Sequence, residues 1–317
     1  TNLYVAEYNS HRIRKVVIAT GAVTTFAGSS DGFLDHNTGT SAKFKNPSAV
    51  TIVGGNLYVA EYGNHKIRKI VLSSGAVTTL AGSGSQGSTD GTGTSATFKF
   101  PQAITSDGTN LYVADTNNNK IRKIDTSTGF VTTLAGSGTA GFTNATGTAA
   151  KFNYPSGITT DGTNLYVADI ENHKIRKIVI STGVVTTFAG SGSAGSANGT
   201  GASASFNKPR GITTDGTNLY VTDHDGHKIR KIVISTGAVT TLAGTGSAAS
   251  TDGPGTSASF NGPIAISTDG TNLYVSENTG NKIRKIALRE TATADVALHN
   301  LDDDTDATVS LASSDTG

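Results

Sequence analysis

The sequence predicts an all-β fold, a six-bladed β-propeller with four-stranded antiparallel blades and a 54-residue repeat. The first observation is an internal repeat, because the tetrapeptide Asn-Leu-Tyr-Val recurs every 54 residues without insertion or deletion. The second is that the apolar runs within each unit have the pattern of short strands rather than of helices. The third is that turn-forming residues separate these runs. The tetrapeptide begins at Asn2, Asn56, Asn110, Asn164, Asn218 and Asn272.

One unit illustrates the four predicted strands. The β-branched residues 157–160 are followed by Asp-Gly-Thr-Asn, in which Gly is free to adopt positive φ. The next run is continuously apolar, which indicates a strand covered on both faces. The last run is Thr-rich, as expected of an outer edge strand. From the axis outward, the predicted strands are 157–160, 165–168, 174–180 and 184–189.

A single sheet of this composition cannot bury both of its faces, so the units must stack around an axis and close into a ring. The predicted propeller spans residues 1–288, and an acidic tail or linker spans residues 289–317. The chain starts at the second strand of its first unit, so the ring lacks an inner strand there and an outer strand in the last unit. Two weakly alternating segments, 293–299 and 307–312, are candidates to complete it. In the alternative interpretation, residues 308–317 open a truncated immunoglobulin-like domain.

Composition limits the chemistry of the chain. There is no Cys, so disulfides, Cys-ligated zinc and a Cys nucleophile are excluded. Cys and Met are both absent, and we expect an extracellular or cell-surface location. No stretch approaches the ~20 apolar residues that span a bilayer, so we expect no membrane insertion. The tail carries seven acidic residues and one basic residue. Its clustered carboxylates are a weak calcium candidate, and we expect no other cofactor; they are Asp302, Asp303, Asp304 and Asp306.

The repeated motifs resemble a known family. The repeated motifs are Asn-Leu-Tyr-Val in six units, Lys-Ile-Arg-Lys, Val-Thr-Thr and Phe-x-x-Pro in five units each, and Asn-His before the Lys in two units. This pattern is similar to the NHL repeat over residues 1–288. The resemblance implies a six-bladed propeller and no single function, because NHL propellers include RNA-binding domains, protein-binding modules and a few lyases. The Ser, Thr and Gly content is similar to that of NHL repeats in large secreted or surface bacterial proteins.

Features that recur in all units are interpreted as structural. Each unit has a carboxylate at the end of its second strand and an Arg in its third, and we expect the two to pair bidentately. Four units have a His at one turn position, where the others have Asn119 and Asn281. These His residues lie on different blades, too far apart to share a zinc ion, so we predict hydrogen-bonding roles. They are His11, His65, His173 and His227.

The main alternative function is a propeller lyase or lactonase with a central metal site. The resemblance implies that NHL-type lyases hold their metal with His near the axis. The predicted inner strands contain no His, Asp or Glu, so we expect no enzymatic activity and no catalytic residues. Those strands are residues 49–53, 103–106, 157–160, 211–214 and 264–267. Nucleic-acid binding is not expected, because most Lys and Arg residues belong to the repeated run and aromatic residues are few.

The candidate binding residues occupy positions that differ between units, because folding alone does not require those differences. They flank the Pro of Phe-x-x-Pro or lie in the turn between the second and third strands, and we expect these segments to share one face. Aromatic and Arg side chains commonly anchor interfaces. The predicted site consists of Tyr8, Tyr62, Phe100, Tyr154, Arg210 and His224. Neutral drift at exposed loops would explain the same differences.

The sequence therefore favours a non-catalytic extracellular module. Its expected partner is a protein or a carbohydrate bound through one face. Self-assembly into a surface layer or filament is a further possibility, because repeat architectures present open edges of low charge.

Overall fold

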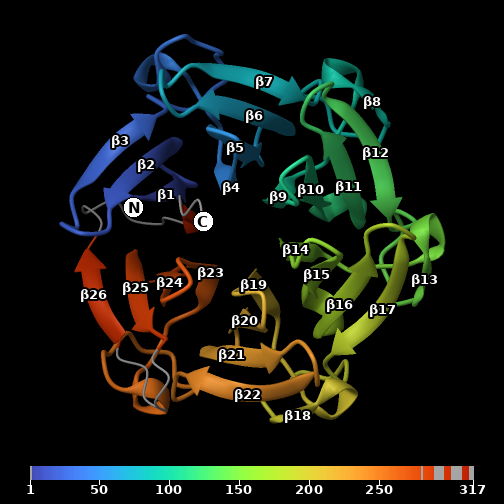
Figure 1. Ribbon diagram of the computed structural model, residues 1–317, viewed down its shortest axis with the longest axis vertical. Helices are drawn as coiled ribbons and strands as arrows, with labels where there is room; N and C mark the ends of the chain where they lie inside the picture. Colours follow the sequence, from blue (N-terminus) through green and yellow to red (C-terminus); the bar gives the residue numbers. More distant parts are fainter. Residues whose placement is uncertain (1, 280, 289–295, 301–308, 314–317) are drawn as a thin grey trace.

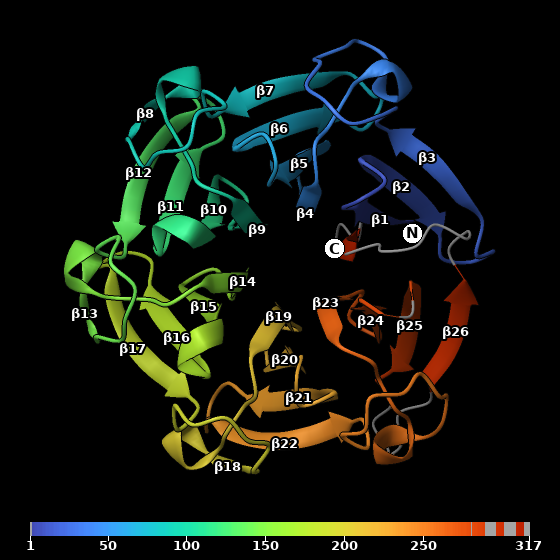
Figure 2. The same cartoon turned by 180° about the vertical axis from the view of Figure 1, so that it is seen from behind.

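The computed structural model describes residues 2–279, 281–288, 296–300 and 309–313. These residues form six antiparallel sheets, which are arranged as blades around a central axis (Figure 1). The view from behind shows the same ring of sheets, with the innermost strands nearest the axis (Figure 2). The predicted fold class, the six-bladed β-propeller, is confirmed.

Each blade contributes four main strands. The inner strands are β27 (Val309–Ser313), β4 (Pro47–Val53), β9 (Pro101–Ser106), β14 (Pro155–Thr160), β19 (Pro209–Thr214) and β23 (Pro263–Thr268). The second strands are β1 (Asn2–Glu7), β5 (Asn56–Glu61), β10 (Asn110–Asp115), β15 (Asn164–Asp169), β20 (Asn218–Asp223) and β24 (Asn272–Glu277). The third strands are β2 (Arg12–Val17), β6 (Lys66–Val71), β11 (Lys120–Asp125), β16 (Lys174–Val179), β21 (Lys228–Val233) and β25 (Lys282–Ala287). The outer strands are β3 (Val23–Ala27), β7 (Val77–Ala81), β12 (Phe130–Ala135), β17 (Val184–Ala189), β22 (Ala238–Ala243) and β26 (Val296–Asn300). Each set is given in ring order, so its members belong to blades 1 to 6.

The C-terminal segments supply two strands of the ring. Strand β27 pairs antiparallel with β1 as the inner strand of blade 1, and β26 pairs with β25 as the outer strand of blade 6. The first and last parts of the chain therefore meet in blade 1, where blue and red strands lie side by side (Figure 1). Residues 309–313, which the alternative interpretation gave to an immunoglobulin-like domain, occupy this place. The division of the chain at residue 288 stays a prediction.

The hydrophobic core lies between adjacent blades rather than within one blade. Between blades 1 and 2, the Tyr4 and Ile13 side chains of one sheet pack against Leu57, Val59 and Ile70 of the next. The Phe of each Phe-x-x-Pro element is fully buried at such a junction; these residues are Phe44, Phe98, Phe152, Phe206 and Phe260. A blade therefore gains its apolar burial from its neighbours, which explains why stacking stabilises the repeat.

The outer strand is not the edge of every blade, contrary to the sequence interpretation. In blades 3, 4 and 5 a two-residue strand of the preceding loop pairs with it; these are β8 (Gly91–Thr92), β13 (Ala145–Thr146) and β18 (Gly199–Thr200). The loops also contain short 3-10 helices. They are η1 (Gly39–Ser41), η2 (Gly93–Ser95), η3 (Thr116–Asn118), η4 (Gly147–Ala149), η5 (Ile170–Asn172), η6 (Gly201–Ser203) and η7 (Gly255–Ser257). Within the described parts of the chain, no helix is long and apolar enough to cross a membrane.

Candidate binding site at the channel mouth

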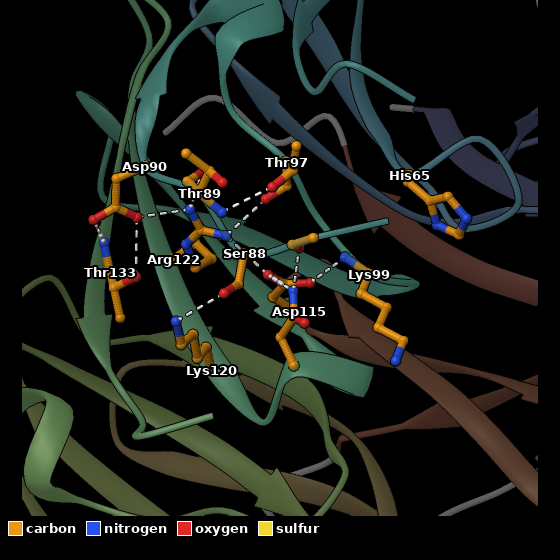
Figure 3. Close-up of polar contacts among 12 residues, drawn as sticks. His65, Ser88, Thr89, Asp90, Thr97, Lys99, Asp115, Lys120, Arg122 and Thr133 are labelled. Carbon is orange, nitrogen blue, oxygen red and sulfur yellow. Dashed lines mark hydrogen bonds and ion pairs between the residues drawn. The ribbon is translucent and has the colours of Figure 1, made fainter. Parts of the chain in front are cut away.

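The repeated charged residues build the blades rather than a site. Figure 3 shows the network around Arg122 in blade 3. Its Nη1 donates to Asp115 Oδ2 at 2.9 Å and to the Thr97 carbonyl oxygen, and its Nη2 donates to Asp90 Oδ1 at 2.7 Å. Asp90 also accepts the backbone N–H of Thr133. One Arg thus joins its own blade to the loop that precedes it.

The expected bidentate pairing is wrong in this blade, because only Nη1 of Arg122 reaches the Asp115 carboxylate. The second Asp115 oxygen accepts the backbone N–H of Lys99 at 2.7 Å. Both side chains of the pair are fully buried. Burial raises the pKa of the Asp115 carboxyl, and the Arg122 charge and these hydrogen bonds oppose that shift.

The repeated His residues connect adjacent blades. His65 Nδ1 accepts the backbone N–H of Phe100 at 3.2 Å, and Asn119 Oδ1 accepts that of Tyr154 at 3.0 Å. His11, His173 and His227 make the same bond to Asn46, Lys208 and Gly262. Their Nδ1 atoms are thereby occupied. Among the described residues, no group of three or more His, Asp or Glu side chains is placed to hold a metal ion.

The accepted N–H groups belong to residues with left-handed backbone. Phe100 has φ 54°, Tyr154 has φ 62° and Lys208 has φ 55°, and each precedes the Pro that starts an inner strand. This conformation costs non-Gly residues about 1–2 kcal/mol. The hydrogen bond from the neighbouring blade helps to offset that cost. The same geometry places these side chains at the face where the inner strands begin.

This face surrounds the mouth of the central channel. The mouth is a cavity of about 100 Å³, lined by the first residues of five inner strands and by Tyr8. Adjacent inner strands approach closely here, because a Cβ on Gly157 would lie 2.1 Å from the Arg210 carbonyl oxygen. The polar side chains in the lining are Tyr8, Ser48, Gln102, Ser156 and Arg210.

Four of the predicted site residues gather on one side of the mouth and form what we call the aromatic arc: Tyr8, Tyr62, Phe100 and Tyr154. The Tyr8 and Tyr62 rings lie 5.5 Å apart edge to face, and the Tyr62 and Phe100 rings lie 4.6 Å apart. Burial and the neighbouring Tyr62 raise the pKa of Tyr8 to about 12. Burial and Tyr154 raise the pKa of Tyr62. Tyr154 is 43% exposed, so the arc offers a surface for contact.

The other two predicted residues, Arg210 and His224, both belong to blade 5. His224 Nδ1 lies 2.6 Å from Asp225 Oδ1, and Lys208 Nζ lies 3.4 Å from Asp225 Oδ2. Burial and the positive charge of Arg210 lower the pKa of His224. The His224 ring has room because blade 6 has Gly262 where blade 4 has Tyr154; a Cβ there would lie 3.2 Å from His224 Nε2.

Sequence reasoning missed a second cavity further along the channel. It measures about 170 Å³ and is lined by five hydroxyl side chains, namely Thr51, Thr105, Thr159, Thr213 and Ser267. An apolar ring of Val50, Ile104, Ile158, Ile212 and Ile266 borders both cavities. The recurring β-branched residue followed by a hydroxyl residue in the inner strands was the available signal. The calcium candidate Asp302–Asp306 lies outside the described residues.

The two faces of the disc differ in how strictly they repeat. On the face opposite the mouth, Asp-Gly-Thr-Asn joins the first two strands in blades 3 to 6, at residues 107–110, 161–164, 215–218 and 269–272. At the mouth, one turn position carries Tyr8, Tyr62, Thr116, Ile170 and His224 in successive blades, and the pre-Pro position carries Asn46, Phe100, Tyr154, Lys208 and Gly262. The blades thus differ more at the mouth than on the opposite face.

Comparisons with known proteins agree with this architecture. No protein-family model matches the chain. Human NHL repeat-containing protein 2 is 32% identical over 212 residues, and the bovine protein of the same name is 30% identical over 277 residues. These matches cover 58% and 75% of this chain. Protein SUPPRESSOR OF QUENCHING 1 of Arabidopsis thaliana, described as chloroplastic, is 29% identical over 74% of the chain. The aligned parts make up only 24–38% of the lengths of these relatives.

Solved structures share the fold at low identity. A chain of a nidogen/laminin complex has a TM-score of 0.69 at 16% identity, with 99% of each chain covered. An auxiliary nutrient binding protein of Bacteroides thetaiotaomicron has a TM-score of 0.62 at 16% identity, with 94% of this chain and 66% of that chain covered. Virginiamycin B lyase of Staphylococcus aureus has a TM-score of 0.54 at 18% identity, with 96% and 82% covered. At these identities the likeness concerns the fold alone.

Proposed function

Because this chain is an NHL-repeat six-bladed β-propeller whose blades differ at one face, we propose that it is a non-catalytic recognition module for a protein partner. The observation that carries the proposal is the concentration of blade-specific side chains at the channel mouth. Folding requires the same contacts six times, so it does not account for an aromatic arc on one side and Arg210 with His224 on the other. Aromatic and Arg side chains are the usual anchors of protein interfaces.

The dimensions of the channel support surface recognition over catalysis. The mouth cavity of about 100 Å³ is smaller than the roughly 300–1,000 Å³ of pockets that enclose small-molecule ligands. The described residues that line the two cavities include no His, Asp or Glu, the usual acid–base and metal-binding groups. A lyase or lactonase of the kind weighed from the sequence would need such groups there. We therefore take the likeness to virginiamycin B lyase as a likeness of fold, and we do not propose its activity for this chain.

A protein partner also suits the face better than a carbohydrate. The aromatic arc and the small mouth cavity together form an open face, across which a protein can lay a surface and insert one side chain. The low content of oxidisable side chains fits a location outside the cell or at its surface, which we include in the proposal. The fold of the nidogen/laminin chain is compatible with this view.

The proposal is tested with binders selected from a randomised peptide library on the immobilised protein. The variant Tyr62→Thr with Phe100→Asn alters the arc with residues that other blades carry at the same positions, Thr116 and Asn46. Phe130→Ala is the matched control, because Phe130 is a 48% exposed aromatic residue at the opposite end of its blade. We expect the arc variant to weaken binding at least 10-fold and the control to leave it unchanged. Binders that tolerate the arc variant would refute the proposal.

A further inference from the structure

We propose that the channel mouth binds an acidic side chain of the protein partner, with the Arg210 guanidinium as the anchor for its carboxylate. This inference rests on the proposed function and specifies the chemistry of its central contact. It assigns separate tasks to the two halves of the face: the aromatic arc contacts the apolar surface around the acidic residue, and Arg210 selects the charge.

Arg210 differs from the repeated Arg residues in its hydrogen bonds. Arg122 Nη1 and Nη2 each donate to a carboxylate and to a backbone carbonyl, as shown in Figure 3. The Nε of Arg210 is buried without a partner, and so is the Nε of Arg122, so the contrast lies in the Nη groups: among the described residues, no acceptor is found for those of Arg210. Burial lowers the pKa of Arg210, while Asp225 and Glu171 oppose that shift. The Nη donors of Arg210 are therefore available to an acceptor on a bound partner, and a hydrogen bond to a charged group is among the stronger ones.

Arg210 also lies at the channel mouth itself. Arg210 stands at the start of β19 and lines the mouth cavity together with Tyr8. Other blades have Ser48, Gln102, Ser156 or Ile264 at this site, so the charge belongs to a single blade. In blade 2 the Ser48 Oγ donates to the Pro101 carbonyl oxygen of the next blade at 3.0 Å. Arg210 forms no such bond, so its guanidinium is not committed to holding the ring together.

The size of the mouth cavity and the shape of the guanidinium both suit a carboxylate. The mouth cavity of about 100 Å³ is small, and its size suits a single side-chain group such as a carboxylate. A planar guanidinium matches a carboxylate with two parallel N–H···O bonds.

The charges around Arg210 disfavour a polyanion. Asp225 and Glu171 lie near enough to influence the Arg210 charge, and both would repel a polyanion such as nucleic acid. Asp225 is occupied by His224 and Lys208. A single carboxylate on an otherwise uncharged or mixed surface meets less repulsion, and the exposed ring of Tyr154 suits apolar flanking residues.

The test uses peptides selected from the randomised library and then synthesised with each acidic residue replaced by its amide. We expect the selected peptides to share one Asp or Glu whose replacement by Asn or Gln weakens binding 10- to 100-fold. Arg210→Ser should lower the affinity for the acidic peptide to that for its amide variant, so the two peptides should then bind equally well. Ser occupies this position in blades 2 and 4, so the variant should fold, and an unchanged melting temperature checks this. Arg210→Lys keeps the positive charge but cannot form two parallel hydrogen bonds to a carboxylate. Its affinity for the acidic peptide should lie between those of the unchanged protein and of Arg210→Ser.

The outcomes separate this inference from the proposed function. Peptides that depend on the aromatic arc but tolerate both the amide replacement and Arg210→Ser would overturn the carboxylate anchor and leave the recognition face in place. Peptides that tolerate the arc variant would overturn the proposed function itself. Displacement of the acidic peptide by polyuridine RNA at submillimolar concentration, but not by acetate, would overturn the inference in favour of a nucleic-acid site.

Discussion

His65 of blade 2 accepts the backbone N–H of Phe100 in blade 3, with 3.2 Å between Nδ1 and the amide nitrogen. The two rings also pack edge to face with their centroids 4.5 Å apart. One His side chain thus joins two blades and orients a residue of the aromatic arc. Because Nδ1 must be unprotonated to accept this hydrogen bond, the contact depends on the charge state of the ring.

We expect His65→Asn to make the protein less sensitive to acid. Burial and the nearby Lys45 and Lys99 lower the pKa of His65 from its ordinary value of 6.5. The unfolded chain then binds a proton that the folded protein does not, so stability from this group is present above pH 6.5 and is lost as the pH falls below it. An Asn side chain does not titrate, and its amide oxygen can accept the same hydrogen bond. Asn119 Oδ1 does so in blade 3.

The measurement is the free energy of unfolding of both proteins by denaturant between pH 7.5 and pH 5. As the pH falls, the free energy of unfolding should decrease less for the Asn variant than for the unchanged protein. Parallel curves for the two proteins would show that the His65 contact does not respond to protonation.

Arg122→Ala should destabilise the protein by about 3–5 kcal/mol, because it leaves the buried Asp115 carboxylate without its partner. Replacing Asp115 by Ala as well should cost less than the sum of the two single changes, since the unpaired charge is then gone. The control is Lys123→Ala, which changes a partly exposed neighbour on the same strand. Denaturant midpoints give the comparison, and equal midpoints for the Arg122 and Lys123 variants would contradict the structural role.

Tyr112→Phe and Tyr58→Phe should differ although the two Tyr residues are equivalent in the repeat. Tyr112 Oη donates to Asp107 Oδ2 at 2.7 Å, whereas blade 2 has Val53 at the position of that Asp. Hydrogen bonds to charged groups contribute about 1.5–3 kcal/mol, so only the first change should lower stability by an amount in that range. Thermal melts of the two variants decide the matter, and equal losses would show that the Asp contact contributes nothing.

Truncation after residue 300 should open blade 1. It removes β27, whose five residues pair with Leu3 to Glu7 of β1. At about 1 kcal/mol for each ladder hydrogen bond, the loss should amount to several kcal/mol. Amide hydrogen exchange should show faster exchange in β1, while β15 in blade 4 serves as an internal reference. Equal protection of β1 in the full-length and shortened chains would mean that β27 does not hold the ring.

Most residues of the candidate site could be predicted from the sequence, because they differ between units at positions of an otherwise strict repeat. Tyr62, Tyr154 and Arg210 occupy positions at which other blades have different residues. Because the four strands of a blade are antiparallel, the turn after the second strand and the loop before the first strand lie on the same face. The contacts among them were not accessible. Tyr62 and Phe100 are 38 positions apart in the chain, and their 4.6 Å ring contact depends on how two blades pack. The missing partner of Arg210 and the small volume of the mouth were likewise visible only in three dimensions.

The sequence by itself determined the number of blades, the order of strands and the structural nature of the repeated charges and His residues. A feature repeated six times at constant spacing has a local or nearest-neighbour cause, which can be inferred from one unit. Only the tertiary structure decided that Arg122 shares its nitrogens among several acceptors, that short loop strands cover three outer edges, and that β26 and β27 join the ring. These features depend on contacts between segments far apart in the chain, and local strand propensity carries no information about the partner that a distant segment finds.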